Sequence, residues 1–157
     1  MARITKIGEA GFTYPAALFL LVVLMIMSAR ALNVWKTSEQ HAREQELLWV
    51  GQQYRQAIKT YYELSPGSEK RYPSDLRDLL EHRFTTQIRR PLRRPYRDPI
   101  TNRAEWGVVT APDGGVMGVY SLSMAEPLKK GGFEESNAEF ANKKHYQDWQ
   151  FIYQPAK

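Results

Sequence analysis

The sequence predicts an α+β fold in which one long N-terminal helix packs on a small antiparallel sheet of about three strands. Residues 16–64 contain no proline and a single glycine, Gly51, so no strong breaker interrupts a helix there. The last third of the chain instead alternates apolar and polar residues in short runs between turn residues, which is typical of strands.

The first part of the predicted helix is apolar on every side. No residue from 12 to 29 carries a charge, and residues 16–27 (AALFLLVVLMIM) are wholly apolar. A helix needs roughly 17–25 residues to span a bilayer, so this run is at the short end of a transmembrane helix. A buried helix of a soluble domain is the alternative, but such helices rarely start a small domain. Arg3 and Lys6 precede the run and favour a cytoplasmic N-terminus.

After the apolar run the helix becomes amphipathic. Its apolar side chains recur at spacings of three, four and seven and therefore share one face. They are Leu47, Val50, Tyr54, Ala57, Ile58, Tyr61 and Tyr62. Charged residues, Glu44 among them, are expected mostly on the other faces, and Ser65-Pro66-Gly67 ends the helix. We expect this stripe to face the last strand through Trp149, Phe151 and Tyr153.

The middle of the chain predicts a short second helix and then a loop. Residues 72–80 begin with Ser74 as the expected N-cap and place Leu76, Leu79 and Leu80 on one side. Residues 83–97 carry six arginines and no acid, and their prolines predict a loop.

Three strands are predicted in the C-terminal part. They are residues 104–110, residues 116–123 and residues 148–154, with a turn at 111–115 that contains Asp-Gly. A polar loop of about twenty residues separates the last two strands. Because three short strands cannot bury their apolar face alone, the helix stripe is the available cover.

The start of the apolar run resembles a processing site. Gly11-Phe12-Thr13 follows a short polar leader and precedes the apolar helix. This arrangement is similar to the prepilin-peptidase site of type IV pilins and type II secretion pseudopilins. The resemblance implies cleavage between Gly11 and Phe12 on the cytoplasmic side of the membrane, and N-methylation of Phe12. The order of a long helix, a variable loop and a small sheet also resembles that family along the whole chain.

Two further stretches are similar to the major type II secretion pseudopilin. They are Asp98-Pro99, before the first predicted strand, and residues 119–122 (VYSL) in the second. The fifth mature residue departs from the family, which usually has Glu where this chain has Ala16. That Glu is expected to pair with the terminal amine of a neighbouring subunit, because an unpaired charge among apolar helices is costly. Either apolar packing suffices without it, or the subunit sits at a filament tip, which we favour.

The resemblance implies three regions and a structural role. Residues 1–11 are the leader, residues 12–35 the transmembrane and filament-core helix, and residues 36–157 a periplasmic pilin-like domain. The expected function is that of a filament subunit, a minor pseudopilin, anchored by a single pass in the bacterial inner membrane and supporting protein export. Assembly would use Phe12, Ala16, Leu18, Leu21 and Leu24. The implied partners are other pilin-like subunits, the prepilin peptidase, the inner-membrane assembly platform and membrane lipids.

Three alternatives remain open. The chain could be a minor type IV pilin, or a signal-anchored periplasmic binding module that does not polymerise. It could also be a secreted domain, because Ala29-Arg30-Ala31 fits the A-x-A pattern of signal-peptide cleavage.

The positive charge is concentrated in one segment. The chain has a net charge of +5, and its basic character favours acidic partners or a membrane surface. Arg89, Arg90, Arg93, Arg94 and Arg97 are the candidate surface and partner residues. We interpret them as a subunit-packing or solvated surface, with anionic lipid or cell-wall contact second and nucleic acid an unlikely partner.

No enzyme is expected. The chain has no cysteine, which excludes disulfides, thiolate metal sites and cysteine nucleophiles. The histidines, His41, His82 and His145, have no plausible nucleophile at a recognisable spacing. Calcium is the one cofactor that the resemblance suggests, because major type II secretion pseudopilins bind it in the loop before the last strand. The acids there, such as Glu134 and Glu139, do not form an Asp-rich ligand pattern, so no cofactor is expected.

Overall fold

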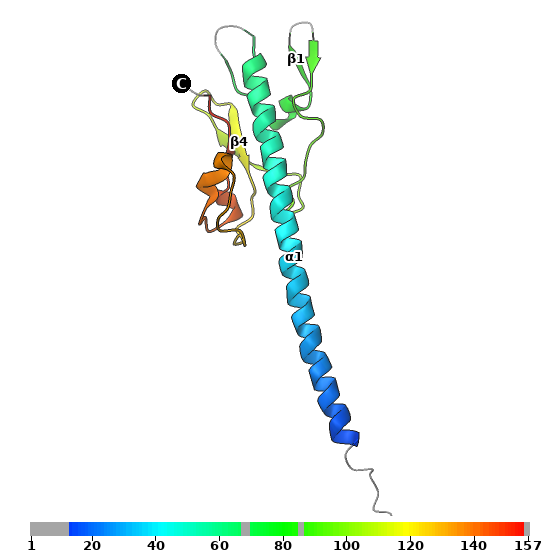
Figure 1. Ribbon diagram of the computed structural model, residues 1–157. Coiled ribbons are helices and arrows are strands. Elements are labelled where there is room, and N and C mark those ends of the chain that lie inside the picture. The colour runs from blue at the N-terminus through cyan, green and yellow to red at the C-terminus, as the bar shows by residue number, and fades with distance from the viewer. Residues whose placement is uncertain (1–12, 67–69, 85–86, 156–157) are drawn as a thin grey trace, which may run out of the picture. The chain divides into compact units, whose positions relative to one another are not determined.

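The computed structural model describes residues 13–66, 70–84 and 87–155, and its mixture of helices and strands confirms the α+β class. The helical elements are α1 (Thr13–Leu64) and the short 3-10 helices η2 (Leu76–Leu79), η3 (Glu135–Phe140) and η4 (Tyr146–Asp148). The strands are β1 (His82–Phe84), β2 (Gln87–Arg89), β3 (Gly107–Thr110), β4 (Val116–Tyr120) and β5 (Phe151–Ile152) (Figure 1).

The continuous N-terminal helix is confirmed over residues 16–64, because α1 runs unbroken through them. The chain divides into two compact units, Met1–Glu39 and Gln40–Lys157, so the boundary falls within α1. The second unit contains the C-terminal part of α1 and every strand.

A three-stranded antiparallel sheet of order β3-β4-β5 stands beside the C-terminal part of α1 (Figure 1). Val108 pairs with Val119, and Val119 pairs with Phe151 on the other side. The predicted turn between β3 and β4 is present, and Gly114 adopts a φ of 84° there, which favours glycine. The sheet therefore has the expected number of strands, although each strand is shorter than its predicted range.

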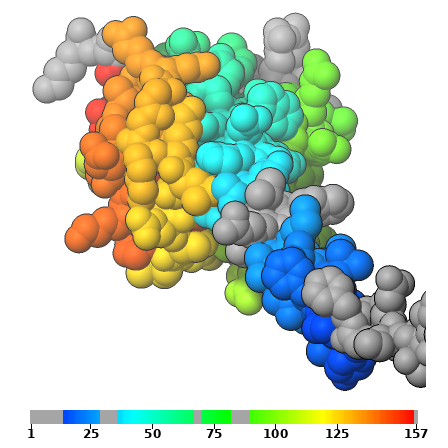
Figure 2. All heavy atoms as spheres, turned by 60° about the horizontal axis from the view of Figure 1, so that its bottom comes forward, coloured from blue at the N-terminus to red at the C-terminus, as the bar shows by residue number. Residues whose placement is uncertain are grey.

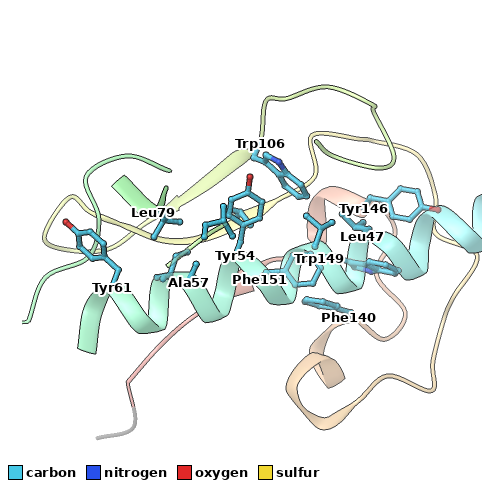
Figure 3. Packing of buried hydrophobic residues seen from close by; sticks show 14 residues of the cluster. Leu47, Tyr54, Ala57, Tyr61, Leu79, Trp106, Phe140, Tyr146, Trp149 and Phe151 are labelled. Carbon is cyan, nitrogen blue, oxygen red and sulfur yellow. The ribbon is translucent and has the colours of Figure 1, made fainter. Parts of the chain in front are cut away.

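The predicted apolar stripe of α1 is confirmed as part of the hydrophobic core. Of the seven predicted stripe residues, all except the half-buried Tyr62 are buried. They form one cluster with the large aromatic side chains of the C-terminal segment, as Figure 3 shows. Those side chains are Phe140, Tyr146, Trp149 and Phe151. The predicted apposition of the stripe with Trp149 and Phe151 is therefore correct, and the partly buried Tyr153 also packs against this cluster.

The short helix predicted within residues 72–80 is present as the 3-10 helix η2, but its predicted cap is wrong. Asp75 rather than Ser74 is the N-cap. The Asp75 carboxylate accepts a hydrogen bond from the Arg77 amide (2.8 Å), while Asp78 accepts from the Asp75 amide (3.2 Å). This reciprocal capping box satisfies two free amides and fixes the start one residue later than predicted. Leu79 is buried on the apolar side, as expected.

The arginine-rich segment is not entirely a loop. Strands β1 and β2 pair within it as a separate two-stranded antiparallel sheet. Pro91 and Pro95 follow the hairpin, so they do not remove any of its hydrogen bonds. The predicted last strand is likewise shorter, because residues 146–148 form η4 before β5 starts at Phe151.

Candidate interaction surfaces

The N-terminal part of α1 exposes an unusual amount of apolar surface. Phe19 is 72% exposed and Met25 69% exposed. The predicted assembly residues Leu18, Leu21 and Leu24 are each about half exposed, and Ala16 is exposed as well. Contiguous apolar surface of this kind marks contact with lipid or with another protein. Gly11 and Phe12, the predicted cleavage site, lie outside the described residues.

Within the part of the chain that the structure describes, no helix has a stretch both long and apolar enough to cross a membrane. The predicted span, residues 12–29, begins outside that part.

A polar cluster around Glu44 joins α1 to the late loop. One carboxylate oxygen, Oε1, accepts hydrogen bonds from the Leu128 amide (2.6 Å), the Lys129 amide (3.3 Å) and the Tyr146 hydroxyl (2.9 Å). The Gln40 amide group donates to the Tyr146 hydroxyl at 2.8 Å. Glu44 is only 1% exposed, and a buried carboxylate is tolerated where hydrogen bonds replace water. We call these residues the Glu44 clamp.

Glu44 is therefore an exception to the expectation that the charged residues lie mostly on the other faces of the helix. It precedes Leu47 by three residues, which places it at the edge of the buried stripe rather than opposite it. This spacing is the feature of the sequence that could have predicted the burial of Glu44. The partners that make burial possible come from loop amides more than eighty residues away, which helical periodicity cannot reveal.

Burial in the Glu44 clamp changes the pKa of one of its side chains. It raises the pKa of Tyr146 to about 12, and the neighbouring Glu44 carboxylate adds to the rise by accepting a hydrogen bond from the phenol and by repelling the phenolate charge. The second Glu44 oxygen, Oε2, makes no hydrogen bond to described residues and lies 3.4 Å from Nδ1 of the exposed His41. The clamp thus links an ionisable surface group to a buried one.

The candidate arginines divide into two groups. Arg90 lies 3.5 Å from Glu81, in an exposed ion pair after the hairpin, and the Arg89 side chain is outside the description. Arg93, Arg94 and Arg97 are exposed, and none of them has an ion pair among the described residues.

Arg94 and Arg97 line one groove with residues of α1. The groove has a volume of about 540 Å³. Its walls are Arg43, Glu46 and Val50 from α1, residues 94–99, and Asn102. Beside it, the Trp49 ring is 51% exposed and meets the Tyr96 ring edge-on at 5.4 Å. We call this hollow the arginine groove.

The wall formed by residues 94–99 is held rigidly. The Tyr54 hydroxyl and the Trp106 indole both donate to the Tyr96 carbonyl, at 3.2 and 2.9 Å. Asp98 is fully buried, and its carboxylate accepts from the Ile100 amide, from Thr101 and, at 2.7 Å, from the Ser121 hydroxyl. The Asp98 carboxylate is therefore satisfied by hydrogen bonds inside the domain and is not available to a ligand in the groove.

No arrangement typical of catalysis or metal binding is found in the described residues. No three His, Asp or Glu side chains gather there as metal ligands. His41 lies beside Glu44, and His145 contacts the Met124 carbonyl through Nδ1 at 2.6 Å. The His82 side chain lies outside the description. In the late loop Glu126 pairs with Lys130 at 2.6 Å, so the calcium hypothesis gains no support.

Comparisons with known proteins find no matching family model, no matching curated protein and no matching solved structure.

Proposed function

We propose that this chain is a structural subunit, a minor pseudopilin, of a type II secretion or type IV pilus-like filament. The observation that carries the proposal is the exposed apolar surface of α1 before the unit that holds the sheet. Leu18, Leu21 and Leu24 are each about half exposed there, next to Phe19 and Met25. Leaving such side chains in water costs about 25 cal/mol per Å² of apolar surface.

Two environments remove that cost. Lipid covers an apolar helix while the precursor is anchored, and neighbouring apolar helices cover it in a filament core. Movement from one to the other needs no catalytic residue on the subunit. Its work is mechanical, and its proposed location is the bacterial inner membrane with the C-terminal domain in the periplasm.

A second observation supports the proposal. The two stretches that resemble the major pseudopilin, Asp98-Pro99 and residues 119–122, meet through the buried hydrogen bond from Ser121 to Asp98. Far apart in sequence, they therefore form one structural unit at the end of β4. If these residues are shared with the major pseudopilin, this hydrogen-bonded contact would attach the loop to the sheet in the same way in both proteins.

Processing of the leader tests the proposal. Gly11→Leu should leave uncut precursor when the chain is produced with a prepilin peptidase, because a large side chain would not fit the small-residue site. Gly8→Leu, three residues earlier in the same leader, is the matched control and should be cut normally. The readout is the intact mass of the membrane-extracted protein. Equal cleavage of the two variants contradicts the proposal. A failure of the peptidase to cut the unchanged chain also contradicts it.

The secretion and pilus versions differ in their neighbours. A secretion filament would require a secretin, and a type IV pilus would require retraction components. Genes for one set or the other beside this one would separate the two readings.

A further inference from the structure

The arginine groove carries an excess of positive charge that the domain itself does not neutralise. Residues 89–103 contain six arginines and one acid, Asp98. Because Asp98 is fully buried and hydrogen-bonded to its own turn, Glu46 is the acidic side chain left in the groove wall. Arg94 and Arg97 line the same groove and have no ion pair among the described residues. This charge favours an anionic ligand.

The late loop of a second copy is a weak complement to the groove. Four exposed acids lie in it, Glu126, Glu134, Glu135 and Glu139, but residues 124–148 contain four lysines against five acids. Glu126 is already paired with Lys130. Figure 2 shows this yellow-to-orange segment covering one flank of the domain. Because its charges nearly cancel, it attracts the groove of another copy only weakly.

The shape and composition of the groove favour a protein segment. A hollow of about 540 Å³ between a helix and a loop admits inserted side chains, whereas a flat membrane surface would reach only its rim. Trp49, Tyr96 and the arginines are the residue types that dominate protein–protein hot spots. Arginine also presents a planar fork that matches a carboxylate.

We propose that the arginine groove docks an acidic segment of a different protein. Carboxylates of that segment contact Arg94 and Arg97, and an adjacent apolar side chain packs on Trp49 and Val50. The Arg94 guanidinium already lies over the Tyr96 ring at 5.1 Å, which limits its freedom before binding. The inference concerns the domain from Gln40 onward and does not require that the chain form filaments.

Photo-crosslinking of the full chain in its native cells tests this inference. Trp49 is replaced by p-benzoylphenylalanine, and the crosslinked peptide is sequenced by mass spectrometry. We expect one protein segment containing Asp or Glu. The double variant Arg94→Glu with Arg97→Glu should lower the crosslink yield about tenfold or more, because like charges then face each other. Lys143→Glu with Lys144→Glu changes the net charge equally and should leave the yield unchanged.

Reversal of the partner's charge completes the test. Asp or Glu in the crosslinked segment is changed to Lys, and this should restore the yield in the Arg94→Glu, Arg97→Glu chain. A crosslink to lipid, nucleic acid or a second copy of this chain would overturn the inference. So would a protein crosslink that ignores the arginine variants, or no crosslink from a folded chain. If the prepilin peptidase does not cut the unchanged chain but the crosslink still depends on charge, the filament function is refuted and this inference stands.

Discussion

Gly51 lies where the helix and the sheet approach most closely. A Cβ built on it would lie 2.4 Å from three carbons of the Phe151 ring, and ordinary contact begins at 3.4 Å. The ring or the helix must therefore move by about 1 Å to admit alanine. Phe151 has little room, because it is fully buried and packs edge-on against Phe140 at a centroid distance of 5.1 Å.

Two opposing effects decide whether Gly51→Ala raises or lowers the free energy of unfolding. Alanine stabilises a helix interior by about 1 kcal/mol relative to glycine. Overpacking a close-packed core typically costs about 1–3 kcal/mol, and a clash with a fully buried ring belongs at the upper end. We expect a net loss of about 1–2 kcal/mol in the free energy of unfolding.

The assay is urea denaturation of the full chain in detergent, followed by near-ultraviolet circular dichroism. Gly131→Ala is the control, because nothing lies within 4 Å of that Cβ position, and it should change stability by less than about 0.5 kcal/mol. Adding Phe151→Leu should make Gly51→Ala less costly than it is alone. If Gly51→Ala raises stability by the full helix-propensity gain, the Phe151 ring does not rest on Gly51 and the core packing described here is wrong.

Four further outcomes are expected. Ile58→Ala should lower the free energy of unfolding by about 2–5 kcal/mol in the same denaturation assay, because the side chain is fully buried; an unchanged midpoint would place it outside the core. Glu44→Ala should cost about 1–3 kcal/mol by leaving loop amides unpaired, and should speed hydrogen exchange of the Leu128 amide; unaltered exchange would refute the clamp. Tyr146 has a folded pKa raised from 10.0 to about 12, so its contribution is intact below pH 10 and is lost as the pH rises to about 12. Tyr146→Phe should therefore flatten the alkaline loss of stability, and a loss as steep as in the unchanged chain would argue against that shift. Ala16→Glu should not improve secretion or pilus function in a complementation assay; a clear gain, or long filaments formed by this chain alone, would refute the tip position.

The helix and its stripe were predictable because each depends on local pattern. No proline interrupts residues 16–64, and the apolar spacing fixes which face of the helix is buried. The pairing of β3 with β4 was also predictable, since two alternating runs joined by a tight Asp-Gly turn pair with each other. Strand ends were not. At the start of the predicted last strand, for example, residues 146–148 form the capped helix η4, and β5 begins only at Phe151.

The interaction surfaces were only partly predictable. Arginine composition located Arg94 and Arg97, but the groove also needs Arg43 and Val50, which come from α1 about fifty residues earlier. Trp49 carried no signal, because an exposed aromatic residue on a helix becomes informative only when its neighbour Tyr96 is known. In each case the missing information is a contact between segments distant in sequence.

The central claim is that the chain is a prepilin-like precursor whose apolar helix enters a filament. N-terminal sequencing with intact-mass measurement of the mature protein from native membranes tests it most directly. The account predicts a chain that begins at Phe12 and carries an N-methyl group. A chain that begins at Leu32 would show signal-peptidase cleavage after Ala31, and an uncut Met1 would show a permanent anchor; either result would contradict the claim.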